Sequence, residues 1–191
     1  MSHQPPEAPS EAGGTTEAVT RGDVRLQIRP ASLDDLDLLA DLYSHLTDQD
    51  MRFRFKGAVT QLSADDLSDL VRREAGMTSY IAFSGARAIA CATLMHDPGR
   101  KSAEVVLCVL PDWKGRGVSW TLLQDVMARA AAAGLKRISS TELGEDREAI
   151  NLQREMGFVA RLQSADPVKL SMVKTLNGSE GPSPPANWQQ E

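Results

Sequence analysis

The chain has 191 residues, 41% of them hydrophobic and 25% charged, which is the ordinary composition of a globular domain with a complete core. Collagen, disorder throughout and a large multidomain enzyme are thereby excluded. The longest unbroken aliphatic run, Val105 to Leu110, is far shorter than the roughly 18 residues of a spanning helix, so we expect no membrane insertion. The N-terminus lacks the basic and apolar regions of a secretory signal, and we therefore expect a cytoplasmic protein.

The formal charge of -5 belongs entirely to the two ends of the chain. Residues 1–23 carry four acidic residues and one basic residue, and residues 177–191 carry two acidic residues, which leaves 20 of each sign in 24–176. A neutral central segment argues against a nucleic-acid-binding domain. Both ends are rich in Pro, Gly and polar residues, which predicts disordered tails at 1–23 and 177–191 around a single domain at 24–176.

The two cysteines, Cys91 and Cys108, lie in apolar segments without CxxC or Cys/His spacing. This pattern suggests neither a metal cluster nor a disulfide framework. We predict two buried, reduced thiols that are inert as acyl acceptors, and no bound metal.

The first predicted elements are a strand and two helices. Residues 24–29 alternate in polarity like a strand, which Pro30 ends. Ser32 followed by Asp35 predicts a capped helix that continues through Leu46. Ser63 followed by Asp66 repeats the same signal for a second helix through residue 71.

In the second half of the chain the sequence predicts six strands and two helices. Turn-forming residues separate strands at 78–83, 88–96 and 103–110, and neighbouring antiparallel strands are the simplest arrangement. A long helix should begin at Val118 and stop at Gly134. A strand at 137–142, a helix at 147–156 and strands at 158–162 and 168–176 complete the order βααβββαβαββ, an α/β (α+β) domain.

The segment between the strand at 103–110 and the long helix is typical of an anion-binding loop. Gly115 and Gly117 allow the backbone to approach a phosphate, and the helix N-terminus adds partial positive charge. Lys114 and Arg116 add full positive charges. The two glycines also suit simple helix capping, so the spacing alone leaves both interpretations open.

Two segments resemble a known family. Residues 105–119, VVLCVLPDWKGRGVS, resemble the acyl-CoA loop of the GNAT superfamily of N-acyltransferases, whose pattern is Gln/Arg-x-x-Gly-x-Gly/Ala. Residues 144–158, GEDREAINLQREMGF, are similar to its second signature, a helix ending in Leu/Met-Gly-Phe. The resemblance spans about 24–176 and implies a GNAT fold, with a mixed, mostly antiparallel sheet flanked by helices. It also implies acetyl transfer from acetyl-CoA to a primary amine, and homodimers are common in the family.

The resemblance further implies which residues hold acetyl-CoA. The strand backbone at 107–109 would bind the pantetheine arm, and residues 115–120 would hold the pyrophosphate. The implied set is Leu107, Cys108, Val109, Lys114, Gly115, Arg116, Gly117, Val118, Ser119, Trp120 and Asp146. Three of these depart from the family pattern: Lys114 replaces Gln or Arg, Ser119 replaces the last Gly or Ala, and Asp146 replaces a frequent Asn. An inward-pointing Asp146 carboxylate would repel the cofactor.

Glu104 is the candidate catalytic residue. It opens an apolar strand and shares a face with Val106 and Cys108, which would partly desolvate its carboxylate. The alternative is a solvated carboxylate paired with Lys101 or Arg100. Ala103-Glu104-Val-Val resembles the Ala-Glu-Phe-Ala strand of bacterial protein lysine acetyltransferases, in which this Glu is the general base. The resemblance thus implies direct transfer to a protein lysine.

A conventional general acid is missing from the sequence. Many GNAT enzymes place a Tyr on the last helix to protonate the leaving thiolate, and the matching position here is Gln153. The chain has two tyrosines, Tyr43 and Tyr80, and we expect each to pack within its own helix or strand. Thiolate is a tolerable leaving group, so this absence slows the reaction without forbidding it.

The acceptor side is predicted less sharply. Arg52, Phe53 and Phe55 lie in a segment similar to the substrate-side Arg-Phe-Phe of protein lysine acetyltransferases, which implies acceptor binding. The alternative is a strand-like connection with both aromatic rings packed inward. Two other functions stay open: acetylation of a small amine, and a catalytically weak acyl-CoA-binding or interaction module, suggested by the joint departures at Ser119, Asp146 and Gln153.

Overall fold

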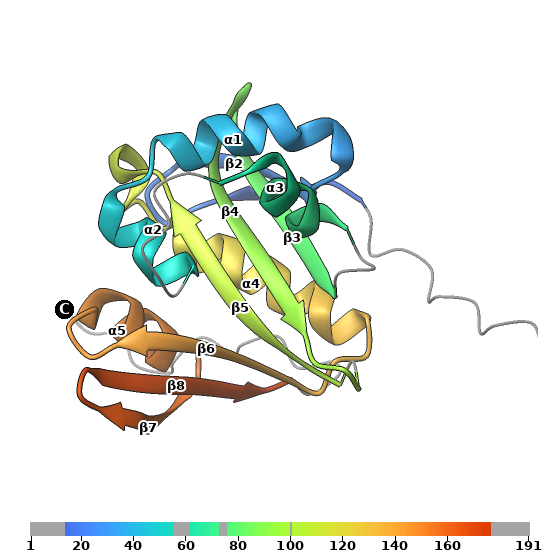
Figure 1. Cartoon of the computed structure of the whole chain (residues 1–191). Helices are drawn as coiled ribbons and strands as arrows, with labels where there is room; N and C mark the ends of the chain where they lie inside the picture. Colours follow the sequence, from blue (N-terminus) through green and yellow to red (C-terminus); the bar gives the residue numbers. More distant parts are fainter. Residues whose placement is uncertain (1–13, 56–61, 73–75, 100, 177–191) are drawn as a thin grey trace, which may run out of the picture.

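The computed structural model describes residues 14–55, 62–72, 76–99 and 101–176, with the side chains of 52–55 left aside. Within these ranges eight strands form one sheet in the order β1-β2-β3-β4-β5-β6-β8-β7 (Figure 1). The pair β5 and β6 is parallel and the other neighbouring pairs are antiparallel. The strands are β1 (Thr16–Val19), β2 (Arg25–Pro30), β3 (Met77–Ser84), β4 (Arg87–His96), β5 (Ser102–Val109), β6 (Arg137–Leu143), β7 (Val159–Ala165) and β8 (Val168–Thr175).

Helices cover both faces of the sheet (Figure 1). They are α1 (Leu36–Ser44), α2 (Asp48–Phe55), α3 (Ala64–Val71), α4 (Val118–Ala132) and α5 (Arg147–Glu155), with 3-10 turns at Leu33–Asp35 and Pro111–Trp113. One apolar core lies between the sheet and α4 and α5, and includes Leu26, Val105 and Leu122. The other lies under α1, α2 and α3, and includes Leu39, Leu70 and Ile81. None of the helices described has the length and apolar character needed to cross a bilayer.

The helix starts and the buried thiols agree with the sequence predictions. Ser63 accepts a hydrogen bond from the Asp66 N–H at 3.1 Å at the start of α3, and Ser32 forms the expected capping box with Asp35. Cys91 and Cys108 are buried, reduced thiols. The predicted antiparallel neighbours at 78–83, 88–96 and 103–110 are β3, β4 and β5.

The helix predicted from Ser32 through Leu46 is present but ends at Ser44, and a second helix that was not predicted follows it. The N–H groups of His45 and Leu46 bond to carbonyls three residues back, which tightens the last turn and ends α1. Thr47 then begins a second helix, because its hydroxyl accepts from the Asp50 N–H at 3.1 Å. The backbone of 51–55 is therefore helical and not a strand-like connection.

The predicted N-terminal tail also needs correction. Thr16–Val19 form β1, which pairs antiparallel with residues 25–28 of β2. The Arg129 guanidinium of α4 donates to the Gly14 carbonyl at 2.9 Å and to the Thr16 hydroxyl at 2.7 Å. This segment has few apolar side chains, so its order comes from edge pairing and from Arg129, neither of which its own composition shows. Residues 1–13 and 177–191 lie outside the described residues.

The feature that creates the site is the divergence of β5 from β6. The two strands pair in register only over 102–104 and 137–139. Beyond that point β5 stays with β4 and β6 stays with β8 over 137–143, so the sheet opens between them (Figure 1).

A partly buried ion pair fixes the passage from β2 into the first helical turn. Two Arg29 nitrogens donate to the two carboxylate oxygens of Asp35 at 2.8 and 2.6 Å. The Ser32 N–H donates to the same carboxylate at 2.8 Å. These hydrogen bonds, with that of Arg29 the largest cause, lower the pKa of Asp35 to about 2.

Asp35→Asn should lower the free energy of unfolding at neutral pH by about 1–2 kcal/mol. A carboxyl whose pKa is lowered on folding stabilises the native state above its unfolded pKa, about 3.9, and loses that contribution as the pH falls through its folded pKa. The difference between variant and wild type should therefore shrink between about pH 4 and pH 2. Urea unfolding across this window measures it, with the exposed Asp34→Asn as the matched control. A difference that is constant with pH would contradict this assignment.

Candidate functional site

The opening between β5 and β6 forms a cleft of about 190 Å³. Residues 104–109 of β5 line one side, and the end of β6 with α5 lines the other. The first turn of α4 and one residue of α2 complete it. The lining residues are Asp50, Glu104, Val105, Val106, Leu107, Cys108, Val109, Lys114, Gly115, Ser119, Leu123, Thr141, Glu142, Asp146, Glu148, Ala149, Leu152 and Gln153.

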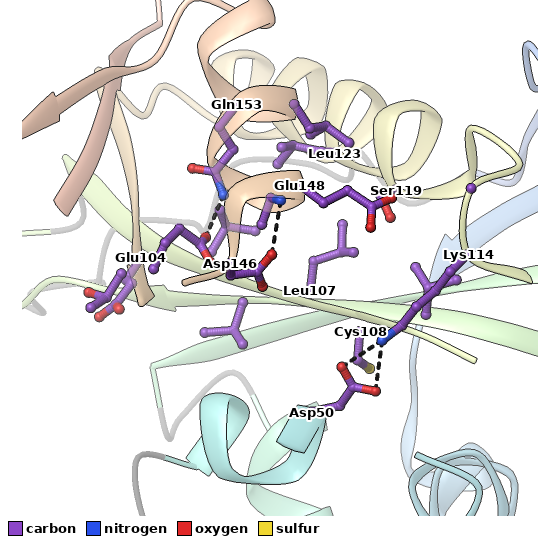
Figure 2. A pocket seen from close by; sticks show the side chains of 18 residues that line it. Asp50, Glu104, Leu107, Cys108, Lys114, Ser119, Leu123, Asp146, Glu148 and Gln153 are labelled. Carbon is purple, nitrogen blue, oxygen red and sulfur yellow. Dashed lines mark hydrogen bonds and ion pairs between the residues drawn. The ribbon is translucent and has the colours of Figure 1, made fainter. Parts of the chain in front are cut away.

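The cleft has two chemically different ends. Figure 2 shows Glu104 and Gln153 toward one end, and Lys114 and Ser119 toward the other, with Leu107 between them. Glu104 is the last β5 residue that pairs with β6, so its end is where the sheet closes. A ligand along the cleft therefore has a loop and a helix N-terminus at one end and carboxylates at the other.

The loop end has the conformation that an anion site requires. Gly115 has a φ of 70°, and no heavy atom lies within 4 Å of where a Cβ would stand, so the backbone is open there. Gly117 has a φ of 77° and is the N-cap of α4, whose N-terminus adds partial positive charge. These backbone groups and Lys114 have the chemistry that the predicted pyrophosphate site requires.

The turn between β1 and β2 supports this loop from behind. The Thr20 hydroxyl donates to the Arg116 carbonyl at 2.7 Å and accepts from the N–H groups of Gly22 and Val24, each at 3.2 Å. A Cβ on Gly22 would lie 2.8 Å from the Arg116 carbonyl oxygen, so the two loops pack backbone to backbone. Sequence reasoning missed Thr20, since the signal is a contact across 96 residues.

Lys114 already has an anionic partner. Its Nζ donates to both carboxylate oxygens of Asp50 at 2.8 and 2.9 Å, and this pair joins the loop to α2. The Lys114 side chain is 44% exposed, so the pair is worth no more than about 1 kcal/mol. A phosphate at this end would compete with Asp50 for the ammonium group.

The predicted cofactor residues divide into two groups. Seven of them line the cleft: Leu107, Cys108, Val109, Lys114, Gly115, Ser119 and Asp146. The other four, Arg116, Gly117, Val118 and Trp120, are not among its lining residues in the described structure. The Arg116 guanidinium lies 5.3 Å from the centre of the Trp113 ring, and that of Arg21 lies 4.2 Å from the centre of the Trp120 ring. Both aromatic rings thus pack around the loop.

Asp146 is held by the helix that follows it. Its Oδ1 accepts from the Ala149 N–H at 3.1 Å, which makes Asp146 the N-cap of α5. The structure thus gives this carboxylate a helix-capping role, although it also borders the cleft.

The end of the cleft that contains Glu104 also contains one residue that sequence reasoning missed. Glu142 lies at the end of β6, and its Oε1 accepts a hydrogen bond from Gln153 Nε2 on α5. Gln153 is itself fixed, because its Oε1 accepts from the buried Ser140 hydroxyl at 2.6 Å. The chain order placed Glu142 only at the end of a short strand, and the opening of the sheet beside that strand is what brings it into the site.

Burial raises the pKa of Glu142, and the negative charges of Asp146 and Glu104 raise it further. Hydrogen bonds from Ser140 and Gln153 oppose this rise. Glu104 is itself half-buried and lines the cleft. Two carboxyl groups from diverging strands thus influence each other in one site.

Both tyrosines lie away from the cleft, as expected. The Tyr43 side chain is buried under α1, α2 and α3, with its hydroxyl 3.7 Å from Cys91 Sγ. Tyr80 belongs to the other core, and the Arg129 guanidinium lies 5.3 Å from the centre of its ring. Since the chain has two tyrosines, no phenol lines the site.

The predicted acceptor residues are only partly placed. The backbones of Arg52, Phe53 and Phe55 belong to α2, and their side chains lie outside the described residues. The helix itself is near the site, because its Asp50 lines the cleft.

The acetyltransferase (GNAT) family model matches residues 39–158. The GNAT domain of S. lividans PAT superposes with a TM-score of 0.77 at 23% identity, covering 85% of this chain and 97% of that one. Vibrio cholerae spermidine N-acetyltransferase, solved with CoA and spermine, gives 0.66 at 19% identity and covers 79% and 95%. RimL, a ribosomal L7/L12 alpha-N-protein acetyltransferase in complex with CoA, gives 0.68 at 13% identity and covers 81% and 96%. The predicted fold is confirmed.

Thr20→Val should loosen the loop without changing the shape of the residue. Because two N–H groups and the Arg116 carbonyl lose a partner, we expect the free energy of unfolding to fall by about 1–2 kcal/mol. The dissociation constant for acetyl-CoA should rise about fivefold, or about 1 kcal/mol. Urea unfolding and calorimetry measure both quantities, with the exposed Thr175→Val as control. Unchanged affinity in a destabilised variant would mean that the turn supports only the fold.

Asp50→Asn should strengthen acetyl-CoA binding, because it frees the Lys114 ammonium group from its ion pair. We expect the dissociation constant to fall about two- to fivefold, and Lys114→Met to raise it. In a double-mutant cycle, Asp50→Asn should have little effect once Lys114 is Met. Calorimetry at low and high salt measures the four constants, with Asp48→Asn, exposed on the same helix, as control. Weaker binding by Asp50→Asn would show that the ion pair itself supports the site.

Proposed function

We propose, since the chain belongs to the acetyltransferase (GNAT) family, that it transfers acetyl groups to lysine side chains of proteins, with Glu104 as the general base. Family membership makes the protein an acyl-CoA-dependent N-acetyltransferase whose cosubstrate is acetyl-CoA. The proposal concerns the acceptor and the residues that act on it. The observation that carries it is the place of Glu104, at the closed end of the cleft and opposite the anion-binding loop.

The loop end suits the phosphates of acetyl-CoA. Lys114, Gly115 and Ser119 would hold them at the N-terminus of α4, and the β5 backbone at 107–109 would hold the pantetheine arm. When bound, acetyl-CoA supplies an acetyl thioester. With the phosphates at the loop, that thioester belongs toward the other end, where Glu104 lies.

Glu104 would remove the proton that makes the acceptor inert. A lysine ammonium has a pKa of about 10.4 and has no lone pair for attack until it is deprotonated. Glu104 would accept this proton directly or through a water molecule. Its position at the last paired residue of β5 holds its backbone firmly, which suits a group that must act on a mobile side chain.

The charge of the cleft supports a cationic acceptor. Five carboxylates line it against one ammonium group, Lys114, which is paired with Asp50. A positively charged amine is therefore attracted to the end away from the loop. The likeness of Ala103-Glu104 to the corresponding segment of protein lysine acetyltransferases, and of the fold to S. lividans PAT, favours a protein lysine. The same charge also suits a small polyamine, and the likeness to a spermidine N-acetyltransferase makes this the second candidate.

Wild-type protein incubated with acetyl-CoA and host lysate should add acetyl groups to specific lysines, and Glu104→Gln should lower their yield about 100-fold. Quantitative mass spectrometry of acetylated peptides measures this. Glu145→Gln, which changes an exposed carboxylate outside the cleft, should match the wild type.

A parallel assay separates the alternatives. Thiol release from acetyl-CoA is followed with spermidine in place of lysate. Turnover with spermidine and no lysine acetylation would overturn the protein-lysine proposal in favour of a small amine. Tight binding of acetyl-CoA without turnover on either acceptor would indicate a binding module.

A further inference from the structure

We propose that Glu142 is the general acid of this enzyme, the group that gives a proton to the sulfur of the leaving coenzyme A. This inference rests on the proposed function, because it assumes amine acetylation with Glu104 as base. It places the general acid on strand β6. The sequence predicted no general acid, because Gln153 stands at the family's tyrosine position.

The position of Glu142 suits this role. The paired end of β6 is Ser139, opposite Glu104, and Glu142 lies three residues further along the diverging strand. Its side chain lines the cleft, and Leu170 on β8 is its apolar neighbour in the sheet. Glu104 and Glu142 thus come from the two strands that separate around the thioester end.

Gln153 is a positioning residue for Glu142. Its Oε1 accepts from the Ser140 hydroxyl at 2.6 Å, so its Nε2 is directed at Glu142 Oε1. The dashed line from Gln153 in Figure 2 marks this bond. One Glu142 oxygen is thereby fixed as the acceptor of the Gln153 bond, and a protonated Glu142 would carry its proton on the other oxygen. Both Gln153 and Ser140 are buried, which keeps the arrangement rigid.

The other proton-bearing groups that line the cleft are less suitable. Asp146 is engaged in capping α5, because its Oδ1 accepts from the Ala149 N–H, and Glu148 is exposed. Lys114 lies at the loop end, bound to Asp50. Cys108 is buried against the core under α1 to α3, and both tyrosines lie away from the cleft.

The surroundings of Glu142 favour its protonated form. Burial raises its pKa, and the two charges that face it, Glu104 from β5 and Asp146 from the start of α5, are both negative and raise it further. Lys114, the cationic side chain among the residues that line the cleft, lies at the loop end, away from Glu142. A carboxyl group whose pKa is raised by its surroundings can act as an acid in an enzyme site.

The protons of the reaction balance if the Glu104 and Glu142 pair starts with one proton, which Glu142 carries. Glu104 first takes a proton from the ammonium group and passes it to solvent. The amine nitrogen then forms a bond to the acetyl carbonyl carbon, and the carbon–sulfur bond breaks with its electron pair going to sulfur. Glu104 takes the second nitrogen proton while Glu142 gives its own proton to sulfur. Transfer from Glu104 to Glu142 restores the starting state, and the net products are the amide, the thiol of coenzyme A and one proton.

Two measurements on Glu142→Gln test the proposal, since this change keeps the shape and the acceptor for Gln153. The kcat with acetyl-CoA should fall about 100-fold, with KM for acetyl-CoA changed less than about twofold. Wild-type kcat should also fall as the pH rises through the pKa of Glu142, and this alkaline decline should be absent from the variant. Glu145→Gln is the matched control outside the cleft.

The second measurement needs no turnover. In substrate-free protein with 13C-labelled glutamate carboxyls, the resonance missing from Glu142→Gln identifies Glu142. Its titration midpoint should lie above the ordinary glutamate pKa of about 4.3 and coincide with the alkaline decline of kcat. A midpoint at or below 4.3, or an unchanged alkaline decline in the variant, would overturn the proposal.

A further assay distinguishes failure of the general-acid proposal from failure of the proposed amine acetylation. If no amine is acetylated, the slow transfer of acetyl to water, followed as thiol release, still reports on the acid. In that case a wild-type rate equal to the rate of Glu142→Gln overturns the general acid, and a higher wild-type rate supports it.

Discussion

The whole site depends on the loss of pairing between β5 and β6 after Glu104. β6 keeps a complete partner in β8, and β5 keeps one in β4, so the two halves of the sheet separate without leaving their own strands unpaired. Helices α4 and α5 hold the halves at a fixed separation from one face. The result is the cleft, which is bounded by the β5 backbone on one side and by side chains of β6 and α5 on the other. This shape suits an extended ligand.

The two ends of the cleft differ in charge. The α4 N-terminus, Gly115 and Lys114 give one end a positive character that suits an anion, while the carboxyl groups of Glu104 and Glu142 line the other end. Lys114 is paired with Asp50, so an anion bound at the loop would compete with Asp50 for the same ammonium group. Asp50 belongs to α2, the helix whose next residues resemble an acceptor segment.

Local signals predicted most of the elements and the loop. Ser63 with Asp66 marked the start of α3, and the glycines at 115 and 117 marked the turn into α4, because these signals act within a few residues. Helix α2 was missed, since its sequence has no helical apolar pattern and its start depends on a single hydroxyl cap at Thr47. Strand β1 was missed because its order comes from β2 and from Arg129, more than 100 residues away.

The sequence by itself determined the order of the elements apart from β1 and α2, the two signature segments and, through them, the acyl-CoA chemistry. It nominated Glu104 because strand alternation and a local resemblance are both short-range. Only the tertiary structure decided that Thr20 supports the loop, that Lys114 is paired with Asp50 and that Glu142 faces Glu104. Each of these is a contact between segments far apart in the chain. Their strength depends on burial and distance, quantities that exist only once the strands have diverged and the helices have packed.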